Sequence, residues 1–133
     1  MERRTFLNSA LAGGAGIAFL PTIAQAAAEP DLVNIVFTES DPAHWKAVEK
    51  LHVPDVKRSG DTITITTPHP MSEAHYIVSH TVVLEGGKFL SRKTFGWKDK
   101  PVSEHILPPG YKGMISVTST CNQHDWWLKT LAV

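Results

Sequence analysis

The feature of this sequence that most constrains its fold is a series of short runs rich in β-branched residues, each bounded by turn residues. The clearest extends from Thr62 to Thr67, where apolar and hydroxyl side chains alternate as they do in a half-buried strand. Comparable runs cover residues 32–38, 76–84, 88–95, 104–107, 112–120 and 126–132. Short strands at such intervals are typical of two packed sheets. We therefore predict an all-β fold, an antiparallel β-sandwich of about seven strands.

Two local signals add detail to this prediction. Glu85-Gly86-Gly87 lies between two of the runs and predicts a hairpin, because glycine tolerates the positive φ that tight hairpin turns need. Asp41 and Pro42 fit the N-cap and first position of a short helix that would continue to Lys50. No repeat or linker divides the chain beyond its first segment, so we expect a single domain over residues 27–133.

The first 26 residues have the pattern of an export signal. Arg3 and Arg4 precede an uncharged run rich in Ala, Gly and Leu, which ends at Ala24-Gln25-Ala26. Paired arginines are typical of twin-arginine signals. An uncleaved membrane anchor is the alternative, but consecutive glycines and Pro21 weaken a spanning helix. We expect residues 1–26 to be a twin-arginine signal peptide and the protein to be periplasmic.

Composition favours an ordinary globular protein and excludes some partners. The 133 residues are 42% hydrophobic and 20% charged, with a formal net charge of +0 at pH 7. Since no basic stripe follows the first few residues, we expect no nucleic-acid partner. The single cysteine cannot form an internal disulfide. Cys121 is therefore an inert buried thiol, an intermolecular bridge, a nucleophile or a metal-bound thiolate.

Three segments place metal-binding side chains beside turns. His52 lies just before Pro54, His69 and His75 bracket a loop between two predicted strands, and Cys121 and His124 form a Cys-x-x-His step directly after a strand. Imidazoles with one thiolate suit iron, copper or zinc rather than magnesium or calcium. We therefore predict one metal site from these five residues. The other histidines are expected to be structural or surface residues: His44, His80 and His105.

In these segments the chain resembles the superoxide reductases, a family that includes neelaredoxins and the iron domain of desulfoferrodoxins. The matching pieces, in order, are Glu49-Lys50-Leu51-His52-Val53-Pro54, His69-Pro70-Met71, His75-Tyr76-Ile77 and Cys121-Asn122-Gln123-His124. The resemblance implies an immunoglobulin-like sandwich that holds a mononuclear non-haem iron in square-pyramidal coordination. The implied ligands are four equatorial histidines and an axial cysteine: His52, His69, His75, His124 and Cys121.

The resemblance also implies an activity, the one-electron reduction of superoxide to hydrogen peroxide at the open position of the iron. The electron would come from an external donor protein, and the absence of a four-cysteine site in the sequence places the chain with the one-iron class. Family members form dimers or tetramers, so a homo-oligomer is compatible with the resemblance.

Two positions depart from the family pattern. A glutamate and a lysine usually stand directly before the first histidine, where they act at the open position and attract superoxide. Glu49 and Lys50 match them, but Leu51 is an additional residue before His52. In a strand it would reverse which face the two side chains use, whereas a loop can absorb it. Asp125 replaces a usual glycine, and its carboxylate either bonds a ligand imidazole or faces solvent.

Three other interpretations remain open at this stage. The first is a non-catalytic periplasmic iron or electron-transfer protein with the same site. The second is a partner-binding sandwich, such as a sulfur-carrier subunit, in which the histidines bind no metal. The third and weakest is a blue-copper protein, which usually has a methionine beyond the cysteine, whereas every methionine here precedes Cys121.

Overall fold

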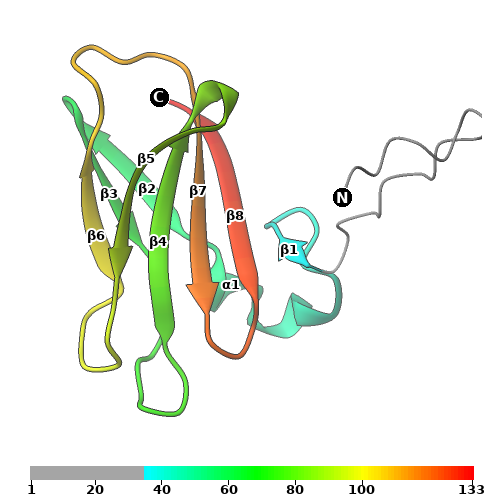
Figure 1. The fold of residues 1–133 in the computed structure, drawn as a ribbon. Coiled ribbons are helices and arrows are strands. Elements are labelled where there is room, and N and C mark those ends of the chain that lie inside the picture. Colours follow the sequence, from blue (N-terminus) through cyan, green and yellow to red (C-terminus); the bar gives the residue numbers. More distant parts are fainter. Residues whose placement is uncertain (1–34) are drawn as a thin grey trace, which may run out of the picture. The chain divides into compact units, whose positions relative to one another are not determined.

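The fold consists of two packed β-sheets, seen in Figure 1. The computed structural model describes residues 35–133, so the predicted signal peptide at residues 1–26 lies outside the described residues. In chain order the elements are β1 (Val36–Phe37), the 3₁₀ helix η1 (Ala43–Val48), α1 (Glu49–His52), β2 (Asp55–Ser59), β3 (Thr62–Thr66), β4 (Ile77–Leu84), η2 (Glu85–Gly87), β5 (Lys88–Thr94), β6 (Val102–Ile106), β7 (Met114–Cys121) and β8 (Trp126–Ala132). One sheet has the order β1-β8-β7-β4-β5 and the other β2-β3-β6.

The all-β sandwich predicted from the sequence is confirmed, with two differences in detail. There are eight strands in the described residues rather than seven, because β2 was not predicted. In β2 only Val56 is even half-buried, so its apolar pattern is too weak to detect, and backbone pairing with β3 holds it in place. The second difference is that β1 pairs in parallel with β8, with Val36 opposite Trp126, so the larger sheet is not wholly antiparallel.

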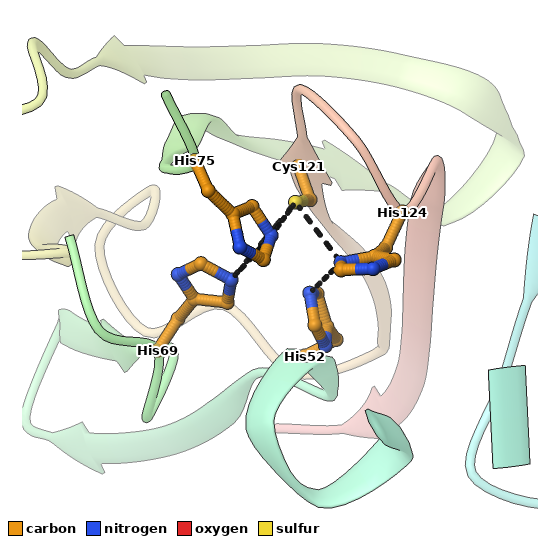
Figure 2. A group of neighbouring side chains, drawn as sticks. All are labelled: His52, His69, His75, Cys121 and His124. Atoms are coloured by element: carbon orange, nitrogen blue, oxygen red, sulfur yellow. Dashed lines mark hydrogen bonds between the residues drawn. The ribbon is translucent and has the colours of Figure 1, made fainter. Parts of the chain in front are cut away.

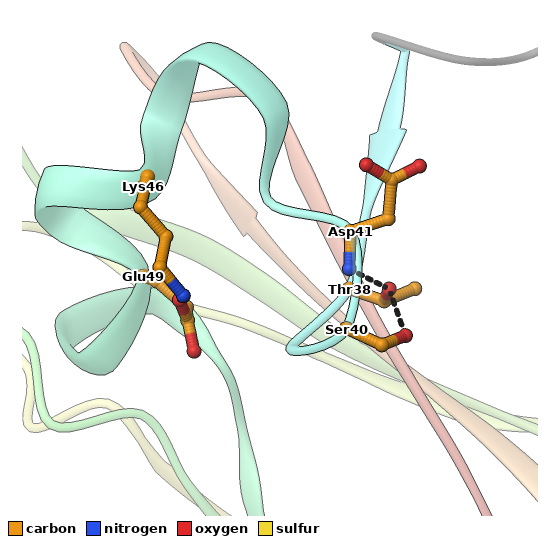
Figure 3. Close-up of polar contacts among 5 residues, drawn as sticks. All are labelled: Thr38, Ser40, Asp41, Lys46 and Glu49. Atoms are coloured by element: carbon orange, nitrogen blue, oxygen red, sulfur yellow. Dashed lines mark hydrogen bonds and ion pairs between the residues drawn. The ribbon is translucent and has the colours of Figure 1, made fainter.

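The predicted hairpin is present, and the predicted helix begins one residue late. Gly86 and Gly87 both have positive φ, 76° and 82°, as a tight connection between β4 and β5 requires. The helical segment begins at Ala43, and no side chain caps it. Asp41 is therefore not the N-cap. Its backbone N–H is instead bonded to Oγ1 of Thr38, as Figure 3 shows.

The apolar core fills one part of the space between the sheets. Ile63 and Ile65 of β3 point inward from the smaller sheet against Val82 of β4 and Val117 of β7. A second, smaller cluster joins Ile77, Phe95 and Cys121, with Met71 packed against it. Among residues 35–133, no helix is long and apolar enough to cross a membrane.

A row of buried polar side chains, here called the hydroxyl–imidazole chain, also lies between the sheets. His80 is fully buried because a register irregularity between Ile77 and Ser79 lets both Ile77 and His80 face inward. Its two ring nitrogens lie 2.8 Å from the hydroxyls of Thr67 and Ser103. The bonds continue in both directions, and the chain consists of Ser91, His105, Ser103, His80, Thr67 and Ser119. His80 and His105 are therefore buried structural residues, as the sequence suggested.

Candidate metal centre

The five predicted ligand residues come together in the structure, although they lie on separate segments (Figure 2). His52 is the last residue of α1, and His69 and His75 lie in the loop between β3 and β4. Cys121 ends β7, and His124 lies in the turn before β8. Pairing of β4 with β7 places Ile77 opposite Cys121, which brings the His69–His75 loop beside the Cys121–His124 turn. One nitrogen or sulfur atom from each residue lies within 4.8 Å of all the others.

The spacing of these atoms matches ligands that share one ion. Nε2 of His69 lies 3.0 Å from Nε2 of His75, and Nδ1 of His124 lies 3.0 Å from Nε2 of His52. Two nitrogens at right angles, each about 2.1 Å from a metal, lie about 3.0 Å apart. The sulfur of Cys121 lies 3.1 Å from Nε2 of His75, which is close to the separation expected for adjacent sulfur and nitrogen ligands.

The four imidazoles form a near-square. Neighbouring ring centroids are separated by 4.6 Å for His52 and His69, 4.4 Å for His69 and His75, 4.6 Å for His75 and His124, and 4.7 Å for His124 and His52. His52 and His75 lie across the square, 6.1 Å apart. The Cys121 sulfur is within 4.0 Å of three of the four inward nitrogens. The four imidazoles and the sulfur therefore surround one point at which a single ion could contact all five residues.

Hydrogen bonds around the site orient its parts. Nδ1 of His52 lies 2.8 Å from the carbonyl oxygen of Val48, which directs Nε2 toward the centre. The Trp127 indole donates to the carbonyl of His124, and its ring stacks against His52. The backbone N–H of Gln123 donates to the Cys121 sulfur at 3.4 Å. The contacts of Val48 and Trp127 leave the donor nitrogens free, whereas the Gln123 N–H bonds the donor sulfur itself.

The Cys121–His124 turn is also tied to the His69–His75 loop. The backbone N–H of Tyr76 donates to Oδ1 of Asn122, and the backbone N–H of Asn122 donates to the carbonyl of Tyr76. The side-chain amides of Asn122 and Gln123 both donate to the carbonyl of Ala74. The two segments, which together carry four of the five donors, therefore form one hydrogen-bonded unit.

Burial keeps three of the imidazoles, those of His52, His69 and His124, in the form that binds metal. Burial, and then the neighbouring His52 and His75, lower the pKa of His69 to about 4. Burial likewise lowers the pKa of His52 and of His124. A neutral imidazole keeps a lone pair for a metal, so these rings are ready ligands at neutral pH. Burial raises the pKa of the Cys121 thiol, so a cation is needed to stabilise its thiolate.

The donor set fits iron. Soft thiolate and borderline imidazole donors suit first-row transition metals, and no carboxylate belongs to the cluster of five among the described residues. The chain could thus hold a metal with His52, His69, His75, His124 and Cys121.

Glu49 and Lys50 lie beside this cluster but are not part of it. Both line a surface hollow of about 280 Å³ that also includes Val53 and Pro68, the residues that follow His52 and precede His69. The Glu49 carboxylate is engaged by Lys46, with Nζ and Oε2 2.6 Å apart (Figure 3). The Lys50 side chain is exposed. Because the segment is helical rather than extended, Leu51 does not simply reverse their faces.

Asp125 has a partner that the sequence did not suggest. Its carboxylate neither bonds a ligand imidazole nor faces solvent alone, but accepts a hydrogen bond from the Trp45 indole. Trp45 and Trp127 flank the histidines and were not predicted as site residues. Trp127 is three residues from His124, but no motif joins Trp45 to a turn 80 residues away, so only the tertiary structure reveals that contact.

Comparison with known proteins identifies the family. The desulfoferrodoxin family model matches residues 39–130, more than half of the chain. The chain belongs to the desulfoferrodoxin family. No curated protein sequence matches it closely enough to count as a relative.

Solved structures of superoxide reductases have the same fold. The superoxide reductase (neelaredoxin) from Ignicoccus hospitalis matches with a TM-score of 0.62 and 23% identity, over 74% of this chain and 93% of that one. The one-iron superoxide reductase from Giardia intestinalis matches with a TM-score of 0.57 and 25% identity, over 63% of this chain and 99% of that one. The superoxide reductase from Nanoarchaeum equitans matches with a TM-score of 0.57 and 20% identity, over 74% of this chain and 100% of that one.

Proposed function

We propose that this protein is a superoxide reductase that converts superoxide to hydrogen peroxide at a mononuclear non-haem iron. The observation that carries the proposal is the near-square of imidazoles with the Cys121 sulfur beside it, in a chain of the desulfoferrodoxin family. The reaction consumes one superoxide, one electron and two protons for each hydrogen peroxide formed. Iron, when bound, supplies the electron by passing from the ferrous to the ferric state.

The ligands proposed for the iron are His52, His69, His75, His124 and Cys121. Four neutral imidazoles and one thiolate carry a single negative charge, so a ferrous site built from them stays positive and attracts the superoxide anion. The Cys121 thiolate donates electron density to the metal, and the Gln123 N–H at 3.4 Å moderates that donation.

Lys50 and Glu49 are proposed to act beside the open position. The hollow is lined by two lysines, Lys50 and Lys129, and by three carboxylates, those of Glu39, Glu49 and Asp55. The role proposed for the exposed Lys50 ammonium is therefore a local attraction of the anion and does not depend on a net positive charge of the hollow. Glu49 is restrained by Lys46, so it would have to exchange that partner to approach the centre.

The proposal extends to the cellular setting. The electron would come from an external one-electron donor protein. The chain would be exported by the twin-arginine route, with residues 1–26 as the signal and residues 27–133 as the periplasmic domain, and could assemble as a homo-oligomer.

Rapid mixing of the ferrous protein with superoxide tests the proposed activity. The protein should be oxidised at a rate near the diffusional ceiling of about 10⁸–10⁹ M⁻¹s⁻¹, and one peroxide should form for each superoxide consumed. Dismutation would instead give one peroxide for every two superoxide ions, with oxygen as the second product. That stoichiometry, or an iron protein that reacts far more slowly, would contradict the proposal; slow reaction would favour the electron-transfer alternative.

A further inference from the structure

Trp45 in η1 touches the turn that carries Cys121 and His124. Its indole N–H donates a 2.8 Å hydrogen bond to Oδ2 of Asp125. Its ring meets the imidazole of His124 edge-on, with centroids 4.5 Å apart and planes at 80°. One side chain from the N-terminal part of the domain therefore contacts two neighbouring residues of the C-terminal turn.

Asp125 occupies a backbone conformation that is costly for most residues. Its φ is 64°, in the left-handed region, where the Cβ of an L-residue crowds the following carbonyl oxygen. Asp and Asn tolerate this region better than other residues of their size. The backbone carbonyl of Asp125 accepts a 3.0 Å bond from the N–H of Cys121, while its carboxylate holds Trp45. One residue thus fixes both the thiolate-bearing backbone and the indole.

His124 depends on this packing for its orientation. Its Nδ1 points into the cluster, toward His52 and Cys121. In His52 the ring nitrogen that faces away from the cluster, Nδ1, is held by the carbonyl of Val48. The corresponding nitrogen of His124, Nε2, has no such hydrogen bond within residues 35–133. The imidazole of His124 packs against the rings of Trp45, His75 and His52. Trp45 is the one of these three that is not itself a proposed metal ligand.

We propose that the Trp45–Asp125 hydrogen bond is a clasp that positions His124 as a metal ligand. The inference rests on the proposed metal site. Neither residue offers an atom to the cluster, so both are positioning residues. Since Trp45 is seven residues before His52 in the chain, the clasp also joins the segment that carries His52 to the turn that carries His124.

Cobalt(II) binding to the iron-free, full-length protein tests the clasp without any superoxide chemistry. Asp125→Gly removes the acceptor and at the same time relaxes the backbone, and Trp45→Phe removes the donor while keeping a ring. Each should weaken cobalt affinity about three- to tenfold, the equivalent of one hydrogen bond. Asp125→Asn is the matched control, because it keeps an acceptor oxygen and tolerates positive φ, and its affinity should stay within about twofold of wild type.

Two further readouts separate positioning from general stability. The double variant Asp125→Gly with Trp45→Phe should bind cobalt about as well as either single variant, because both remove the same bond. The visible cobalt spectrum should shift in the Asp125→Gly and Trp45→Phe variants and match wild type in Asp125→Asn. Unchanged affinity and spectrum in both of the first two variants, additive losses, or an Asp125→Asn variant that behaves like Asp125→Gly would each overturn the clasp.

The outcomes for clasp and function are distinct. A wild-type protein that binds no cobalt would overturn the metal site and the clasp with it. Normal cobalt results in a protein that fails to reduce superoxide would leave the clasp supported and remove only the proposed reaction.

Discussion

Lowering the pH protonates histidines, and His80 is the one most isolated from water outside the metal cluster. It is fully buried between the sheets, and both of its ring nitrogens contact hydroxyls of the hydroxyl–imidazole chain. Burial, followed by the nearby His105, lowers its pKa from 6.5 to about 4. At pH values between about 4 and 6.5, His80 is protonated in the unfolded chain and neutral in the folded protein.

The sign and size of the effect follow from this difference. Because the pKa is lower in the folded protein, the contribution of His80 to the free energy of unfolding is highest above pH 6.5 and falls as the pH drops toward 4. At 1.36 kcal/mol for each pKa unit, the loss at about pH 4 amounts to about 3 kcal/mol. This is a sizeable part of the stability of a small domain.

Chemical denaturation at a series of pH values measures the effect, with His80→Gln as the matched control. The glutamine amide can still bond Thr67 and Ser103 but does not titrate. The variant should be less stable at neutral pH and lose about 3 kcal/mol less than wild type between pH 7 and 4. The other histidines are common to both proteins, so their contributions largely cancel in the difference. Parallel pH profiles, within about 1 kcal/mol, would refute the claim that His80 stays neutral in the fold.

Three other substitutions test separate parts of the account. Ile65→Ala should cost about 2–5 kcal/mol of unfolding free energy in denaturant titrations, because Ile65 is fully buried in the main core, and a loss under about 1 kcal/mol would contradict that packing. Lys50→Ala should slow the oxidation of the ferrous protein by superoxide and flatten its dependence on ionic strength; an unchanged rate and salt slope would remove Lys50 from the mechanism. Lys46→Ala should change stability by at most about 1 kcal/mol, since the Lys46 side chain is 74% exposed, and a loss above about 2 kcal/mol would show that the pair with Glu49 is structural.

Strands with a buried face could be predicted from the sequence, and strands without one could not. Thr62 to Thr66 alternates buried and half-buried residues, so its period was visible. Asp55 to Ser59 is almost wholly exposed, and it is a strand only because its backbone pairs with β3. The parallel pairing of Val36 with Trp126 joins residues from opposite ends of the domain, which no local pattern encodes.

The candidate ligands could be named from residue type and from their place beside turns, but their convergence depends on long-range register. The pairing of Ile77 with Cys121 brings the His69–His75 loop beside the Cys121–His124 turn, and α1 supplies His52 as its last residue. The partner of Asp125 was missed for the same reason, because Trp45 lies 80 residues away. The surroundings of Glu49 could likewise be established only from the structure, because the sequence did not show whether Leu51 lies in a strand, a loop or a helix.

The central claim is that His52, His69, His75, His124 and Cys121 hold one iron. Metal analysis and the visible spectrum of the oxidised protein, isolated from iron-replete cells, test it most directly. The control is Cys121→Ser, which replaces the sulfur by oxygen at nearly the same place. We expect stoichiometric iron and a thiolate-to-iron charge-transfer band that disappears in Cys121→Ser. Metal-free or zinc-only protein, or a band that survives the substitution, would contradict it.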